Sequence, residues 1–246
     1  MKLFDHYSFR ARLQPALLTL VPAALTALAW APPGARWPTT LWSLLGGVGF
    51  TFFLENVARN RGQPTETALF NSWGGKPTTQ LLRHSGPANS VLRDRWHKQL
   101  AKVVGKPLPT ADEERANPAA ADELYEAATR LLIGKTRNAK TYPLVYKENV
   151  SYGFCRNLYA LRSLGKTVSI FGLLLSIGAG VWLLKTGKGD LLPWGCAVVC
   201  GALALWWFFT VTTDWVKVPA VNYAQHLFES CEKLSRARQP ADPKKS

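Results

Sequence analysis

Residues 141–184, TYPLVYKENVSYGFCRNLYALRSLGKTVSIFGLLLSIGAGVWLL, join a segment rich in aromatic and cationic side chains to an uncharged apolar run. The apolar part, Thr167–Leu184, would extend about 27 Å as a helix, close to the thickness of the hydrocarbon core of a bilayer. The part before it, Thr141–Lys166, has two open interpretations. It suits an anchor at the headgroup level of a membrane, and it equally suits a surface that binds single-stranded nucleic acid.

Three further apolar runs are long enough to cross a membrane: Gln14–Ala31, Thr39–Leu54 and Leu191–Val211. Pro22 should loosen or kink the first run. Small residues in the last two runs of the chain would let helices approach closely, and we assign helix packing to Gly172, Gly180 and Gly201. The pattern predicts two transmembrane hairpins, with four spans in total.

The sequence therefore predicts an all-α membrane protein, in which the two hairpins flank a helical cytoplasmic insertion and an amphipathic helix follows. The expected parts are an N-terminal interfacial helix and first hairpin (1–58), a basic helical domain (59–166), a second hairpin (167–213), and a C-terminal amphipathic helix with a disordered tail (214–246).

The charge distribution predicts the orientation. The chain carries a net charge of +14, and residues 59–166 contribute 18 lysines and arginines against 9 aspartates and glutamates. Cations cluster on the cytoplasmic side of membrane proteins. We expect a multi-pass protein of the bacterial inner membrane, with both termini and the insertion in the cytoplasm, and anionic partners such as membrane lipids or nucleic acid.

Two segments of the insertion have the apolar periodicity of helices. Ser90–Val104 should form a helix with one apolar face, which is made of Val91, Leu92, Trp96, Leu100 and Val103 or Val104. Ala119–Ile133 should bury a face that includes Leu124 and Leu131. The insertion is too small for a large core of its own.

The basic and aromatic residues of the insertion form two candidate nucleic-acid-binding groups. The first group is Arg83, Arg93, Arg95, Trp96, Lys98 and Lys102; the second group is Lys135, Arg137, Lys140, Tyr142, Tyr146 and Lys147. The first group lies far beyond the nearer span, so the rule that places cations beside spans does not require it. A specific anionic ligand and an ordinary solvated surface both stay open.

Polar residues within the predicted spans or beside them are candidates for lining or gating a pore: Glu55, Asn56, Ser169, Ser176 and Thr210. A carboxylate such as Glu55 is costly at that depth and can line a pore mouth. Alternatively, Glu55 lies among headgroups and pairs with Arg59, its neighbour one helical turn on.

No catalytic arrangement stands out, and we expect neither an enzyme nor a cofactor nor a metal site. The histidines are scattered, and the four cysteines lack the spacing of metal ligands. We expect reduced thiols that serve as small packing residues.

Three segments, GKPTTQLLRH (75–84), RDRWHKQLA (93–101) and PLVYKENVSYGFCRNLYALRSLG (143–165), make the chain resemble the membrane effectors of the Hailong anti-phage defence system. This resemblance implies an oligomeric ion-conducting effector of abortive infection, with a nucleotidyltransferase as partner protein. It also implies a single-stranded oligodeoxyadenylate ligand that holds the pore closed.

The leading functional prediction is thus a homo-oligomer, for example a tetramer, whose ion-conducting pore is gated by a single-stranded DNA or oligonucleotide ligand at the basic insertion. The alternative is a non-conducting membrane scaffold that recruits a soluble partner through its cytoplasmic domain and tail helix.

Overall fold

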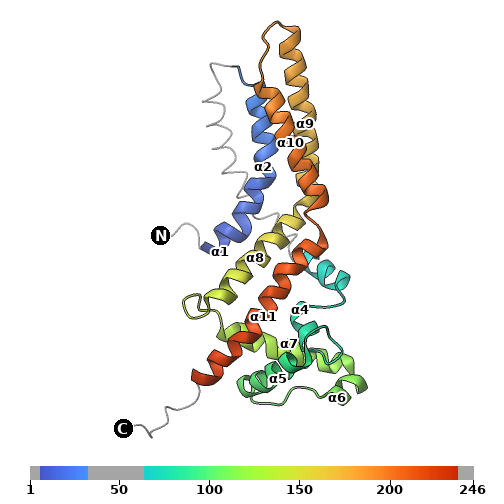
Figure 1. Ribbon diagram of the computed structural model, residues 1–246, viewed down its shortest axis with the longest axis vertical. Coiled ribbons are helices and arrows are strands. Elements are labelled where there is room, and N and C mark those ends of the chain that lie inside the picture. Colours follow the sequence, from blue (N-terminus) through green and yellow to red (C-terminus); the bar gives the residue numbers. More distant parts are fainter. Residues whose placement is uncertain (1–5, 33–63, 238–246) are drawn as a thin grey trace, which may run out of the picture. The chain divides into compact units, whose positions relative to one another are not determined.

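The computed structural model describes residues 6–32 and 64–237, and every regular element in these ranges is helical (Figure 1). The elements are α1 (His6–Ser8), a π-helical turn η1 (Phe9–Leu13), α2 (Gln14–Trp30), α4 (Pro77–Leu82), α5 (Ser90–Val104), α6 (Ala111–Ala116), α7 (Pro118–Lys135), α8 (Pro143–Ala160), α9 (Arg162–Lys185), α10 (Leu192–Phe209) and α11 (Thr213–Ala237). Residues 64–72 are also helical.

The chain divides into two compact units. Unit 1 comprises Met1–Thr67 and Gly153–Val216, and unit 2 comprises Ala68–Tyr152 and Lys217–Ser246. Both α8 and α11 contain residues of each unit. The domain boundaries that were predicted from the sequence lie at residues 58, 166 and 213.

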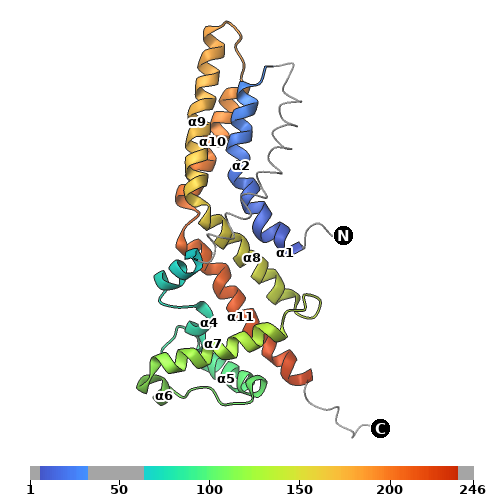
Figure 2. The same ribbon diagram turned by 180° about the vertical axis from the view of Figure 1, so that it is seen from behind.

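Unit 1 contains three helices that are long and apolar enough to cross a membrane: Phe9–Trp30, Arg162–Lys185 and Leu192–Phe209. They pack side by side (Figures 1 and 2). Their outer faces are strongly apolar, since Phe171, Val198 and Phe209 are 60%, 72% and 78% exposed. Such exposure is unfavourable in water and is expected of helices that face lipid. Because every regular element of the described residues is helical, the predicted all-helical class is confirmed. The span predicted over Thr39–Leu54 lies outside the described residues.

Small residues lie where these three helices touch. A Cβ on Gly172 would be 3.1 Å from Cys200 Sγ and from Thr26 Oγ1, and one on Gly180 would be 2.7 Å from Trp194 Cε2. Gly201 has more room, with Leu173 Cδ1 3.7 Å away. The α2 helix continues through Pro22, which is buried in the same bundle.

Unit 2 has its core between α4, α5, α7 and α11. The fully buried side chains include Leu82, Leu100, Leu132 and Phe228. Local signals fix the ends of the helices: Asn89 caps α5, because its side chain accepts the Val91 and Leu92 N–H groups. The tail helix α11 supplies one wall of this core, so its apolar face is used within the chain.

The predicted apolar faces of α5 and α7 are partly wrong. Leu124 and Leu131 are about half exposed, and the buried face of α7 instead includes Tyr125 and Thr129. Burial of Tyr125 is made possible by a hydrogen bond from its hydroxyl to a buried carboxylate of α6. In α5, Val91 and Leu92 are 75% and 45% exposed, whereas Trp96, Leu100 and Val103 are buried.

Candidate nucleic-acid interface

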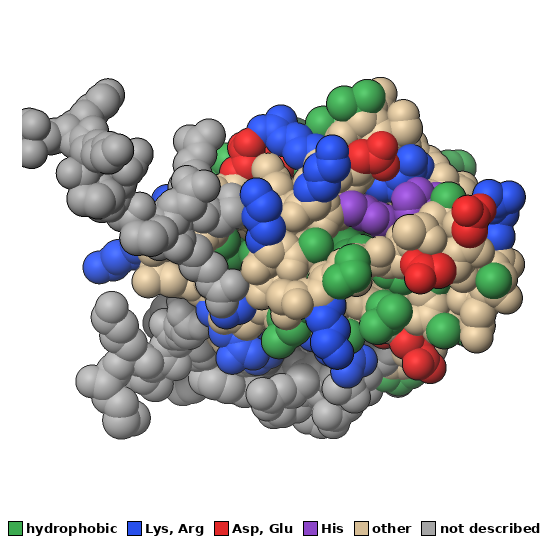
Figure 3. Space-filling view, turned by 90° about the horizontal axis from the view of Figure 1, so that it is seen from below, with side chains coloured by type: hydrophobic (Ala, Val, Ile, Leu, Met, Phe, Trp, Pro, Cys, Tyr) green, Lys and Arg blue, Asp and Glu red, His purple; other side chains and the backbone are tan. Residues whose placement is uncertain are grey.

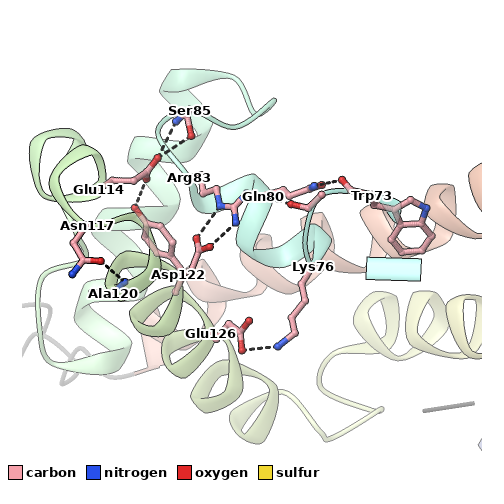
Figure 4. A network of polar contacts seen from close by, with 12 residues as sticks. Trp73, Lys76, Gln80, Arg83, Ser85, Glu114, Asn117, Ala120, Asp122 and Glu126 are labelled. Carbon is pink, nitrogen blue, oxygen red and sulfur yellow. Dashed lines mark hydrogen bonds and ion pairs between the residues drawn. The ribbon is translucent and has the colours of Figure 1, made fainter. Parts of the chain in front are cut away.

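Arg83, from the first predicted group, is an internal structural link. Its Nε donates to Asp122 Oδ1 at 2.8 Å and its Nη2 to Asp122 Oδ2 at 2.5 Å (Figure 4). The hydrogen bond to Asp122 raises the pKa of Arg83 above its ordinary value, against the opposing effect of burial. This bidentate pair joins the residue that follows α4 to α7, so the guanidinium is already committed.

Arg93, Arg95 and Trp96 are also engaged within unit 2. Arg93 is largely buried and donates to the His84 carbonyl at 2.9 Å. Arg95 forms an ion pair with Glu232 of α11. Trp96 is 5% exposed, with its ring centroid 5.5 Å from that of Phe228. These three side chains hold the fold together and leave little for a ligand.

The two lysines of the first group differ. Both lie on the exposed side of α5. Lys102 has an interaction partner within the chain. Lys98 has no hydrogen bond or ion pair with any described residue, so it is the one member of this group whose charge stays uncommitted within residues 6–32 and 64–237.

The second group contains four cations of a different kind. Lys135 ends α7, Arg137 and Lys140 lie in the connection to α8, and Lys147 lies in the second turn of α8. All four are exposed, and none has a hydrogen bond or ion pair from its side chain to a described residue. We call these four residues the α7–α8 cations. They are the largest set of uncommitted cations among the predicted binding residues.

The connection that carries these cations is held in a defined conformation. Asn138 Oδ1 accepts the Lys140 N–H at 3.0 Å and the Thr141 N–H at 3.3 Å. Lys233 of α11 donates to the Thr141 carbonyl at 2.7 Å. These hydrogen bonds hold the connection against the core of unit 2, so its cations are carried by a backbone of defined conformation.

The two tyrosines of the second group are less accessible than a role in nucleic-acid binding would require. Tyr142 is 9% exposed, its pKa is raised by burial, and the Lys233 ammonium lies 5.6 Å from its ring centroid. Tyr146 is half-buried and has an interaction within the chain. No aromatic side chain in the described part of unit 2 is fully exposed. A ligand there would be held through phosphates rather than by stacked bases.

A buried carboxylate hub lies beside the first group and was missed by sequence reasoning. Glu114 is 6% exposed and accepts hydrogen bonds from the His84 and Ser85 N–H groups, the Ser85 hydroxyl and the Tyr125 hydroxyl (Figure 4). The rings of His84 and His97 meet edge to face, with centroids 4.9 Å apart. The one sequence signal near this hub is the acidic run that follows Thr110, which marks the start of α6 and carries no information on the distant partners of Glu114.

Three of the five pore candidates lie among the described residues. Ser169 and Ser176 are fully buried in unit 1, and their hydroxyls have no hydrogen-bond partner among the described residues. Thr210 is half-buried at the end of α10. Glu55 and Asn56 lie outside the described residues. Within one chain the two serines face packed helices.

The surface of unit 2 carries both signs of charge. Figure 3 shows lysine and arginine side chains spread over the face in view, with acidic side chains between them and histidines near the centre of one side. Across residues 6–32 and 64–237, no group of histidine, cysteine, aspartate and glutamate is arranged to hold a metal ion. The uncommitted α7–α8 cations are therefore the strongest candidate ligand surface.

Comparison of the chain with protein-family models, with curated proteins and with solved structures found no match. The functional argument accordingly depends on the residues and their geometry.

Proposed function

We propose that this chain is an ion-conducting membrane effector whose unit 2 binds a single-stranded oligonucleotide at the α7–α8 cations. One observation carries the proposal: four exposed, unpaired cations lie within 13 residues, on a segment that continues through α8 into the candidate span α9. A ligand held there would act on the helix that leads to the membrane.

The chemistry of the α7–α8 cations favours phosphate recognition. Each lysine or arginine that neutralises a phosphate releases condensed counterions, so binding is strong at low salt and weakens steeply as salt rises. Without an exposed aromatic side chain for stacking, discrimination between bases should be modest. An oligodeoxyadenylate would then be one good ligand among several single strands of similar length.

The proposed coupling uses the short break between α8 and α9. Leu161 interrupts an otherwise helical run from Pro143 to Lys185, and it is 1% exposed. Across the break the Arg162 guanidinium lies 4.0 Å from the centroid of the Tyr159 ring. A ligand that binds two arrangements of this break with different affinity would shift the population between closed and conducting states.

The membrane arrangement belongs to the proposal as well. We place four spans in the bacterial inner membrane, with both termini and unit 2 in the cytoplasm, following the cation excess of those parts. A homo-oligomer would surround the pore. The nucleotidyltransferase partner and the role in anti-phage defence follow from the resemblance to Hailong effectors alone, and we assign no enzymatic activity.

The test combines ligand binding with ion flux. Full-length protein in liposomes is compared with the quadruple variant K135Q/R137Q/K140Q/K147Q and with a control, K98Q/K106Q, which removes exposed cations elsewhere in unit 2. Because each cation contributes about 0.7 to the salt slope on a single strand, the quadruple variant should flatten the slope of log K against log salt by about 3 and abolish the oligonucleotide effect on flux. The control, whose lysines lie outside the proposed site, should leave the slope of log K against log salt nearly unchanged.

The outcomes separate the hypotheses. A normal slope and a normal flux response in the quadruple variant would refute binding at the α7–α8 cations. Oligonucleotide binding without flux under any condition would favour the non-conducting scaffold.

A further inference from the structure

The outward face of α7 carries an apolar stripe that the core of unit 2 does not use. Its members, which we call the α7 stripe, are spaced by four and three residues in turn: Ala120, Leu124, Ala127, Leu131 and Gly134. All five residues are exposed, and Leu124 and Leu131 are 54% and 49% exposed. In Figure 2, α7 lies on the near side of unit 2. The stripe is therefore a surface without a partner among the described residues.

The spacing of the stripe is that of a two-stranded coiled coil. Steps of four and three average 3.5 residues, which keeps one row of side chains against a facing helix. Leucines alternate with small residues here, so each leucine of one helix can pack against a small residue of the other. A Cβ on Gly134 would meet nothing within 4 Å, so packing within the chain does not explain its small size.

A shallow groove lies on the same surface. Its volume is about 520 Å³, and it is lined by Glu123, Glu126, Ala127, Arg130 and Leu131. The first four of these are at positions i, i+3, i+4 and i+7 of one helix. Four residues in this arrangement form the hole that receives one side chain of a facing helix in a coiled coil. The groove is thus placed to receive a leucine of a partner helix.

The charges beside the stripe identify the partner as a second copy of α7. Glu123 and Arg130 lie seven residues apart, on one flank of the stripe. Glu123 is exposed and has no hydrogen bond or ion pair with a described residue. Arg130 has a 79% exposed side chain and approaches Glu126 only to 3.8 Å. The flank therefore offers one charge of each sign to a neighbour.

These charges also select the direction of the second helix. In an antiparallel pair, equal flanks face each other, so Glu123 of each copy lies beside Arg130 of the other. In a parallel pair, each flank faces the opposite flank, which would bring Arg130 beside Lys135 of the other copy. Like charges at that point are unfavourable, so the antiparallel arrangement is the favoured one.

We propose that two copies of this chain contact each other through antiparallel α7 helices, packed along the α7 stripe. The leucines of each copy lie against the small residues of the other, and Glu123 and Arg130 form two equivalent ion pairs at the rim. Such a contact is isologous, with the same surface used by both copies. The inference deepens the homo-oligomer of the proposed function and rests on that part alone, because it needs neither ion conduction nor an oligonucleotide.

Cysteine cross-linking of purified full-length protein tests the contact and its direction. Near the centre of an antiparallel stripe, Ala127 lies close to Ala127 of the other copy, whereas the two copies of Ala120 lie roughly 20 Å apart along the helices. A short bismaleimide should therefore convert Ala127→Cys into cross-linked dimers and leave Ala120→Cys uncross-linked. The four native cysteines are buried, so wild-type protein gives the background.

Charge reversal makes the test specific. In the Ala127→Cys background, E123R and R130E should each lower the yield of dimer about tenfold, because symmetry turns two ion pairs into two like-charge pairs. An equal mixture of the two variants, carrying tags of different length, should restore the yield and link only unlike chains. Arg115→Glu is the control, since it makes the same change of charge at an exposed residue of α6.

Three results would each overturn the antiparallel contact: no cross-link at Ala127, equal cross-linking of Ala120→Cys and Ala127→Cys, or no recovery in the mixture. Size-exclusion chromatography of the same samples separates this failure from that of the proposed function. An oligomer that stays intact without the Ala127 cross-link would mean that another surface holds it, whereas a monomer would refute the homo-oligomer as well. Unchanged melting temperatures confirm that the variants are folded.

Discussion

Glu114 is a single residue that connects three segments of unit 2. Its carboxylate accepts hydrogen bonds from the chain after α4 and from Tyr125 of α7, while its backbone lies in α6. Burial alone would raise the pKa of Glu114, but the hydrogen bonds from His84, Ser85 and Tyr125 outweigh it and leave the pKa below its ordinary value. The charged form is therefore the one that the fold requires.

Glu114→Gln should destabilise unit 2, because an amide N–H₂ would face donors that now meet an oxygen. The cost of leaving such a buried group unsatisfied is about 1–3 kcal/mol. Thermal unfolding in detergent measures the change, and Asp112→Asn, two residues away on the exposed side of α6, is the control. Equal melting temperatures for both variants would contradict the role of the hub.

The lowered pKa of His97 predicts how the stability of unit 2 depends on pH. Burial lowers the pKa of His97, as do the nearby His84 and Arg93, although the hydrogen bond to the Leu82 carbonyl opposes them. Below its ordinary value of 6.5 the unfolded chain binds a proton that the folded side chain does not, so stability should fall as the pH drops from 6.5 towards the folded pKa.

Glu114 acts at lower pH. Its folded pKa is depressed from 4.5, so its contribution is present above 4.5 and is lost as the pH falls through the folded value. His97→Gln should flatten the fall in melting temperature that begins as the pH drops below 6.5, and leave the loss below pH 4.5 unchanged. A variant curve parallel to that of the wild type from pH 6.5 down to 4.5 would show that His97 does not titrate there.

At the scale of the element, α9 should tolerate side chains on one face and reject them on the other. A Cβ on Gly165 would lie 2.3 Å from Trp207 Cε2 and one on Gly180 2.7 Å from Trp194 Cε2, whereas one on Gly178 would meet Trp30 at an ordinary 4.0 Å. Gly165→Ala and Gly180→Ala should each cost about 1–3 kcal/mol through overpacking. Gly178→Ala should be neutral or slightly stabilising, by up to about 1 kcal/mol.

Melting temperature and size-exclusion profile in detergent would check this series. Identical behaviour of the three alanine variants would mean that the helices separate readily at these points.

The tail helix α11 should behave as part of the core of unit 2. Leu227 is fully buried, while Val218 in the same helix is 61% exposed. Leu227→Ala should cost about 2–5 kcal/mol, and Val218→Ala should cost much less. Limited proteolysis of the two variants would compare them. For the same reason, deletion of residues 222–246 should unfold unit 2.

Sequence reasoning identified elements better than contacts. The bounds of Ser90–Val104 were predicted as they occur, because Asn89 and Gly105 are strong local signals. Arg83 and Arg95 were predicted as ligand contacts, but their partners, Asp122 and Glu232, lie 39 and 137 residues away. Local sequence patterns carry no information on such distant pairs. The α7–α8 cations could be distinguished from the other predicted binding residues only after the structure showed which cations have partners within the chain.

At the scale of the whole molecule, the four cysteines report on the two units separately. All four thiols are free and buried; Cys231 lies in unit 2, where burial raises its pKa to about 12, and Cys200 lies in unit 1. Mild heating of Glu114→Gln should let a maleimide modify Cys231 well before Cys200, as read by peptide mass mapping. Simultaneous modification would indicate one cooperative unit, and wild-type protein provides the reference temperature.

The placement of charge along α9 has a mechanical consequence. Lys166 and Lys185 enclose 18 uncharged residues, and α10 is 18 residues long, so each apolar stretch measures about 27 Å against about 30 Å for an average hydrocarbon core. An apolar stretch that is shorter than the hydrocarbon core either thins the bilayer locally or draws the lysines at its ends into the apolar region. A bilayer made of longer acyl chains would increase this mismatch and would strain the protein even when no ligand is bound.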